Sequence, residues 1–103
     1  MLSDHPRPWT EEPVLGGGFI TDANGQKVLF VSSSALRAQI ILWANAEEVQ
    51  MRRGWTAKLR ETRWVVVDCP WQVCNWLKRQ SFTDPATALV EADKWLTEQE
   101  GKP

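Results

Sequence analysis

The chain has 103 residues, of which 43% are hydrophobic and 24% charged, and its formal net charge at pH 7 is −1. These values are typical of a single globular domain and exclude an intrinsically disordered chain. There is no run of 18 apolar residues such as a membrane-spanning helix needs, and an acid and two prolines stand where a secretory signal would carry basic and apolar residues. We therefore expect a cytoplasmic protein with no membrane partner.

The first 31 residues predict an arm followed by a β-hairpin. Residues 1–15 contain Pro6, Pro8 and Pro13, which interrupt backbone hydrogen bonding, so we expect an N-terminal arm there. In residues 18–31, two β-prone segments flank Asn24-Gly25, a pair that favours the positive φ angles of a tight hairpin turn.

The three glycines at 16–18 follow the proline-rich arm and precede a strand. A phosphate loop instead lies between a strand and a helix, whose free N–H groups bind the anion. These glycines therefore predict a flexible joint and no cofactor site.

A long helix is predicted next. Serines at 32–34 offer an N-cap, apolar residues follow at helical spacing, and Gly54 is a natural C-terminal residue after the helix ends near Arg52.

In the second half of the chain, weaker sequence patterns predict the same order of two strands and a helix. Residues 62–68 are β-branched and aromatic, which indicates a strand. Residues 71–77 alternate apolar and polar side chains and are read as a second strand, although Trp71, Cys74 and Leu77 also share helical spacing, so a short helix stays open. Asp84-Pro85 predicts the start of a final helix ending near residue 100.

The predicted fold class is α+β, with a small antiparallel sheet, two helices packed on one of its faces and the order β-β-α-β-β-α. We expect the arm at 1–15 and a single domain at 16–101, made of a first ββα unit at 16–54 and a second at 55–101.

Catalytic and metal sites lack support in the sequence. Cys69 and Cys74 are spaced differently from a redox C-x-x-C motif, and a zinc site needs two further ligands, for which the one histidine, His5, is far away in the chain. We expect free thiols, no metal, no cofactor and no enzyme activity.

The most informative feature is a basic central segment rich in tryptophan. Residues 52–79 carry seven bases and two acids, whereas the segments before and after are acidic. Trp and Arg dominate the binding energy of protein interfaces, and the same combination binds single-stranded nucleic acid. Strand alternation, however, places Arg63 and Trp64 on opposite faces. The residues we predict to contact a partner are Arg52, Arg53, Trp55, Arg60, Trp76, Lys78 and Arg79.

Pro8-Trp9, followed by Gly17-Gly18-Phe19-Ile20, Asp22-Ala23-Asn24-Gly25 and Val28, resembles the hairpin opening of small phage and prophage accessory proteins. Ala44-Asn45-Ala46 lies in the matching helix. The resemblance covers about a third of the chain and leaves the basic half uncovered. It implies an accessory protein of a mobile element that binds host or phage machinery, including defence or regulatory complexes as an inhibitor, without catalytic residues.

The sequence thus predicts a non-enzymatic binding module with a protein partner. The alternative is a nucleic-acid-binding protein that uses the same patch. A homodimer built on the surplus tryptophan surface also stays open.

Overall fold

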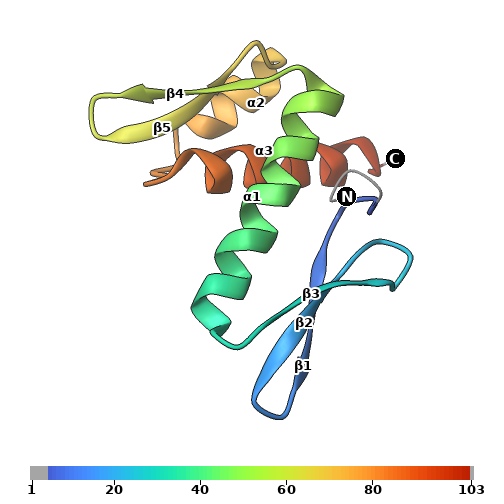
Figure 1. Ribbon diagram of the computed structural model, residues 1–103. Coiled ribbons are helices and arrows are strands. Elements are labelled where there is room, and N and C mark those ends of the chain that lie inside the picture. The colour runs from blue at the N-terminus through green and yellow to red at the C-terminus, as the bar shows by residue number, and fades with distance from the viewer. Residues whose placement is uncertain (1–4, 103) are drawn as a thin grey trace. The chain divides into compact units, whose positions relative to one another are not determined.

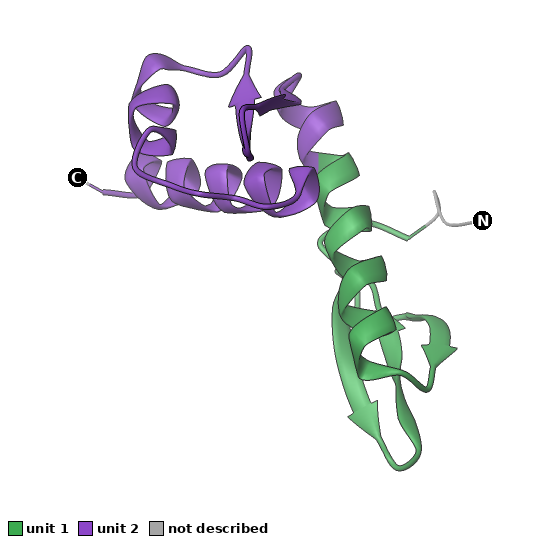
Figure 2. Ribbon diagram, turned by 90° about the vertical axis from the view of Figure 1, so that its left-hand side faces the viewer, with its two compact units in different colours: residues 1–48 green, residues 49–103 purple. Residues whose placement is uncertain are grey.

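The computed structural model describes residues 5–102 and confirms an α+β fold. Five strands and three helices follow in the order β-β-β-α-β-β-α-α (Figure 1). The chain divides into two compact units, residues 1–48 and 49–103, and the division falls inside the long helix α1, Ser34–Arg53 (Figure 2). The strands form two separate antiparallel sheets instead of the expected single sheet, with three strands in the first unit and two in the second.

The first unit contains a three-stranded sheet in the order β1-β2-β3. Strands β2, Gly17–Thr21, and β3, Lys27–Val31, form the predicted hairpin, with Gly25 at a φ of +80° in the turn. Strand β1, Thr10–Val14, pairs with β2 and lies within the segment expected to be an arm. For residues 10–14 that expectation was wrong, because Pro13 lies on an edge strand, where a missing N–H donor is tolerated, while residues 1–4 of the predicted arm lie outside the described residues.

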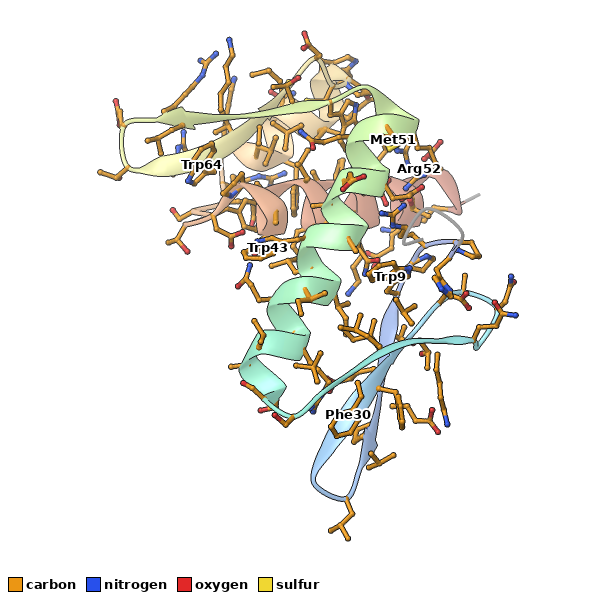
Figure 3. All side chains as sticks on the ribbon, in the orientation of Figure 1. Trp9, Phe30, Trp43, Met51, Arg52 and Trp64 are labelled. Atoms are coloured by element: carbon orange, nitrogen blue, oxygen red, sulfur yellow. The ribbon has the colours of Figure 1, made fainter. Side chains whose placement is uncertain are left out.

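Trp9 anchors the start of the chain in the core of this unit. Its side chain, labelled in Figure 3, is buried. It belongs to a core cluster with Ile20, Val31 and Ala44. Its backbone N–H donates to Asn45 Oδ1 at 2.7 Å, and Asn45 Nδ2 donates to its carbonyl at 3.1 Å. The segment that precedes β1 is therefore held by α1 through both polar and apolar contacts.

Helix α1 has the predicted ends. The N–H of Leu36 donates to Ser33 Oγ at 3.2 Å, which satisfies one of the free donors of the first turn. After Arg53 the chain turns at Gly54, whose φ of +73° favours glycine. Local signals therefore fix both ends of this helix.

The second unit consists of a hairpin and two helices. Strand β5, Arg63–Val67, was expected, whereas its partner β4, Thr56–Arg60, was not. Residues 71–77 form helix α2, Trp71–Leu77, so the strand predicted there was wrong and the helical alternative is correct. Cys69-Pro70 ends β5, and the apolar residues Val73 and Leu77 then turn inward at helical spacing, one turn apart.

Helix α3, Pro85–Glu100, begins as predicted, because Asp84 accepts a hydrogen bond from the N–H of Thr87 at 3.0 Å and Pro85 occupies the first turn. Its inward face packs on β5 and α2. Among its described residues, the buried apolar side chains of this unit are Val49, Trp55, Val66, Val73, Leu77, Ala86, Ala88, Leu89, Ala92 and Leu96. This core holds the hairpin and α2 in place, and both elements build the candidate site.

Candidate functional site: a basic cavity between the β4–β5 hairpin and α2

Trp55 lies in the core of the second unit. Only 4% of its surface is exposed, which corrects the expectation that its ring lies on the surface and contacts a partner. The guanidinium of Arg53 lies 5.2 Å from the centre of the ring. One of the seven residues predicted to contact a partner is therefore a core residue.

Arg52 and Arg53 are paired with acids of α3. Asp93 accepts from Arg52 at 3.0 Å and from Arg53 at 2.8 Å, and Glu100 accepts from Arg53 at 3.1 Å. Burial opposes ionisation of Asp93, but the hydrogen bonds and charges of the two arginines outweigh it and lower the pKa of the carboxyl. This cluster joins the end of α1 to α3 and is separate from the cations described next.

The ring of Trp76 packs against other aromatic rings of the second unit. It stacks on Trp95 with ring centres 5.4 Å apart and an angle of 17° between planes, and it also contacts Phe82, with centres 5.9 Å apart. Trp76 is half-buried. Its main role in the structure is to join α2 to α3, with only part of its surface open to solvent.

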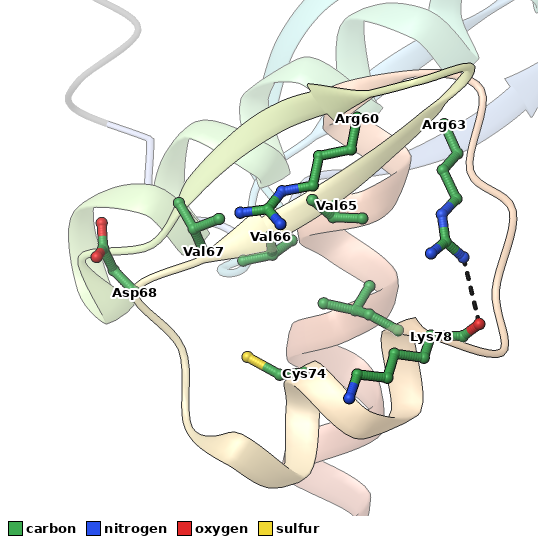
Figure 4. A pocket seen from close by; sticks show the side chains of 9 residues that line it. Arg60, Arg63, Val65, Val66, Val67, Asp68, Cys74 and Lys78 are labelled. Atoms are coloured by element: carbon green, nitrogen blue, oxygen red, sulfur yellow. Dashed lines mark hydrogen bonds between the residues drawn. The ribbon is translucent and has the colours of Figure 1, made fainter.

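A cavity of about 300 Å³ opens between the β4–β5 hairpin and α2 (Figure 4). Cations extend into it from both walls: Arg60 and Arg63 from the hairpin, and Lys78 from the end of α2. Its remaining lining residues are Val65, Val66, Val67, Asp68, Cys74 and Leu77. We call this site the basic cavity.

Strand pairing places the hairpin cations together. Arg60 lies directly opposite Arg63, and Lys58 lies opposite Val65, so by alternation all three cations share one face of the hairpin. Trp64 and Val66 lie on the other face, as the sequence predicted. Like charges directly opposite each other destabilise a sheet. The Arg60–Arg63 pair is therefore not explained by its contribution to stability.

Arg63 is fixed against α2. Its Nη1 donates to the backbone carbonyls of Lys78 and Gln80, at 3.2 Å each. These bonds satisfy carbonyls beyond the end of α2 and hold the guanidinium at the edge of the basic cavity (Figure 4). Arg63 is not among the seven predicted residues, although strand alternation from Arg63 to Val67 was a signal that could have found it.

Of the seven predicted residues, the structure brings Arg60 and Lys78 together at the basic cavity. Arg79 is exposed and adjoins Lys78 in sequence, without lining the cavity.

Two thiols lie close together near the basic cavity, and one of them, Cys74, lines it. Cys69 and Cys74 are both free and half-buried, with their Sγ atoms 3.2 Å apart. Burial and the neighbouring Cys74 raise the pKa of the Cys69 thiol to about 12. The turn after β5 thus brings together two cysteines that are five residues apart in the sequence.

No group of three or more metal-ligating side chains occurs among residues 5–102. Within the same range no helix is long and apolar enough to cross a membrane. His5 lies in the first unit, where its Nδ1 is 2.9 Å from Asp22 Oδ2. Comparisons with protein-family models, curated proteins and solved structures give no match for this chain.

Proposed function

We propose that this chain is a non-enzymatic binding module that docks on an acidic, partly apolar segment of a partner protein through the basic cavity. The observation that supports this most is the convergence of Arg60, Arg63 and Lys78 around a wall of valines. Only Asp68 opposes these three cations among the lining residues. A carboxylate flanked by apolar side chains matches both the charge and the apolar wall.

The residue types suit protein recognition. An arginine guanidinium binds a carboxylate through two parallel hydrogen bonds, and the fixed position of Arg63 lowers the entropy lost when it binds. The exposed Lys58 and Arg79 extend the positive charge beyond the cavity and would speed association with an acidic partner. The apolar wall adds the burial of apolar surface to the binding energy, which the charges alone do not provide.

The alternative, a nucleic-acid-binding protein, finds less support. Single strands bind where exposed aromatic rings alternate with cations. Here Trp55 is buried, Trp76 stacks on Trp95, and Trp64 lies on the hairpin face opposite the cations. The charge for phosphate contacts is present, but none of these three rings is placed beside it for base stacking, and the exposed Trp71 on α2 does not line the basic cavity.

The resemblance to phage accessory proteins concerns the hairpin of the first unit and does not reach the basic cavity. Within this proposal the protein is an accessory factor of a mobile element, acting in the cytoplasm on a host or phage complex. Its second unit supplies the contact residues. The partner is then expected to present an acidic surface.

A direct test titrates the full chain against a fluorescent peptide of alternating Glu and Leu, and against fluorescent oligothymidine, at two salt concentrations. We expect peptide binding with a shallow salt dependence, weakened about tenfold or more by Arg60→Glu with Lys78→Glu, since each rim charge reversal costs roughly 1 kcal/mol. Lys94→Glu with Lys102→Glu, which changes the net charge equally outside the cavity, is the matched control. Tight oligonucleotide binding with a steep salt dependence favours the alternative. Peptide binding that the double reversal leaves unchanged contradicts the proposal.

A further inference from the structure

Cys69 and Cys74 form a close pair that the spacing of the sequence did not predict. Their Sγ atoms are 3.2 Å apart, whereas a disulfide needs about 2.05 Å, so a movement of roughly 1 Å joins them. Cys69 lies in the turn between β5 and Pro70, and Cys74 lies on α2. We expect a side-chain rotation in this turn to make that movement without displacing the core of the second unit.

The two thiols differ in access. Cys74 lines the basic cavity, and Figure 4 shows its sulfur at the cavity wall facing the end of β5. Cys69 does not line the cavity, and its Sγ donates to the carbonyl of Val66 at 3.4 Å. A reagent that enters the cavity therefore meets Cys74 first.

The positive charges at the cavity favour anionic reagents. Arg60, Arg63 and Lys78 attract anions, and the cavity volume of about 300 Å³ suits a small molecule. A thiol in the wall of such a cavity is placed to meet small disulfides that carry carboxylates.

We propose that Cys69 and Cys74 are a dithiol site that reduces small anionic disulfides and is converted to an intrachain disulfide. This site goes beyond the proposed docking function and does not depend on it, because its reaction is followed at the thiols themselves.

The reaction consists of two thiol–disulfide exchanges. The Cys74 thiolate attacks one sulfur of the small disulfide, forms a mixed disulfide and releases the first thiolate, which takes up the proton lost by Cys74. The Cys69 thiolate then attacks the sulfur of Cys74 and releases the second thiolate, which takes up the proton of Cys69. Overall, two protein thiols are oxidised to one disulfide and one small disulfide is reduced to two thiols.

The environment of Cys69 suits the second step. Burial, and then the hydrogen bond and charge of Cys74, raise its pKa, so in the reduced protein it stays protonated and attacks external disulfides slowly. Once Cys74 has become a mixed disulfide, the contributions of its thiol disappear. Burial, the largest cause, still raises the pKa of Cys69, but its Sγ already lies 3.2 Å from the sulfur that it attacks.

The experiment measures the rate of thiol loss in the reduced full chain with three probes: glutathione disulfide, which is anionic, hydroxyethyl disulfide, which is neutral, and cystamine, which is cationic. Each rate is divided by that of the same protein unfolded in urea, which removes the intrinsic reactivity of the probe. We expect glutathione disulfide to react about tenfold faster than cystamine in the folded protein, and added salt to reduce this ratio. Intact mass should show the loss of two hydrogens with no retained adduct.

Variants test the separate roles of Cys69 and Cys74 and the preference for anionic disulfides. Cys69→Ser should accumulate one glutathione on Cys74, and Cys74→Ser should react much more slowly than the wild type. Arg60→Gln with Lys78→Gln should bring the probe ratio close to one, while Lys94→Gln with Lys102→Gln should leave it unchanged. The proposal is overturned if the wild type retains glutathione adducts or forms disulfide-linked dimers. Equal rates for the anionic and cationic probes overturn it as well.

Discussion

Trp76 on α2 stacks on Trp95 on α3 with ring centres 5.4 Å apart and an angle of 17° between planes. This contact joins the short helix that carries Cys74 and precedes Lys78 to the longest helix of the second unit. Because α2 has only seven residues, its stability depends on such tertiary contacts. The geometry of the basic cavity therefore depends on an aromatic pair that is not part of its lining.

Replacing Trp76 with alanine should lower the free energy of unfolding by roughly 2 kcal/mol, about half the cost of truncating a fully buried tryptophan. Trp71→Ala on the same helix is the matched control, since that side chain is 71% exposed, and it should change stability by less than about 0.5 kcal/mol. Chemical denaturation followed by circular dichroism measures both. Equal effects of the two variants would show that the stack does not hold α2.

Gly18→Ala should destabilise the first unit, because an added Cβ would lie 2.7 Å from Nε of Arg37. Arg37 has little freedom to move: it is buried, it donates to the carbonyl of Val31 at 2.8 Å, and it forms an ion pair with Glu11 at 3.1 Å. We expect a loss of about 1–3 kcal/mol in the free energy of unfolding, typical of overpacking.

The control for that variant is Gly101→Ala, where the added Cβ meets only ordinary contacts at 3.6 Å. Its urea midpoint should stay close to that of the wild type. A midpoint for Gly18→Ala that matches the wild type would mean that Arg37 relocates without cost.

Stability should fall in acid through Asp22. Burial opposes its ionisation, but hydrogen bonds from His5 and from the N–H groups of Gln26 and Asn24 outweigh this effect and lower the pKa of the carboxyl from its ordinary value. Because the folded-state pKa is the lower one, this stabilisation is complete above the unfolded-state value and is lost as the pH falls through the folded-state value.

The variant Asp22→Asn tests this relationship, since the amide oxygen still accepts a hydrogen bond but carries no charge. It should be less stable than the wild type at pH 7, and the difference between the two urea midpoints should shrink below about pH 4. A difference that stays constant with pH would contradict the contribution of the Asp22 charge.

Asp93→Asn should lower the free energy of unfolding by about 1 kcal/mol, a value reduced because Arg52 is 46% exposed and solvent screens its charge. The exposed Glu98→Gln on the same helix is the control. A double-mutant cycle with Arg53→Gln measures the coupling between the two side chains, and high salt should reduce it. If the effects of Asp93→Asn and Arg53→Gln were additive, the ion pair between these two side chains would not contribute to stability.

The elements with strong local signals could be predicted from the sequence. The Asn24-Gly25 turn, the glycine after α1 and the Asp84-Pro85 helix start each depend on the backbone preferences of one or two residues. Strand β4 could not, because Thr-Ala-Lys-Leu-Arg has little β propensity and is a strand only by pairing with β5. Helix α2 was ambiguous, since seven residues are compatible with either period.

The sequence predicted the basic segment that contains the candidate site, but not the spatial arrangement of its side chains. Composition identified the basic residues, but it could not separate Arg53, which pairs with Asp93, from Arg60, which lines the basic cavity. That distinction depends on tertiary contacts of α3, more than 30 residues away in the chain. The proximity of Cys69 and Cys74 likewise depends on the helix that was read as a strand.

Strand β1 has a consequence for the behaviour of the protein at high concentration. It is an edge of the three-stranded sheet, and all five of its residues are exposed. An exposed edge invites pairing with a second chain, the first step towards aggregation. Here Glu11 pairs with Arg37, the exposed Glu12 places a negative charge on that edge, and Pro13 removes one hydrogen-bond donor. A second copy that paired with this edge would therefore meet a charge and a gap in the ladder. The proline that obscured this strand in the sequence thus protects the sheet from growing by addition of further chains.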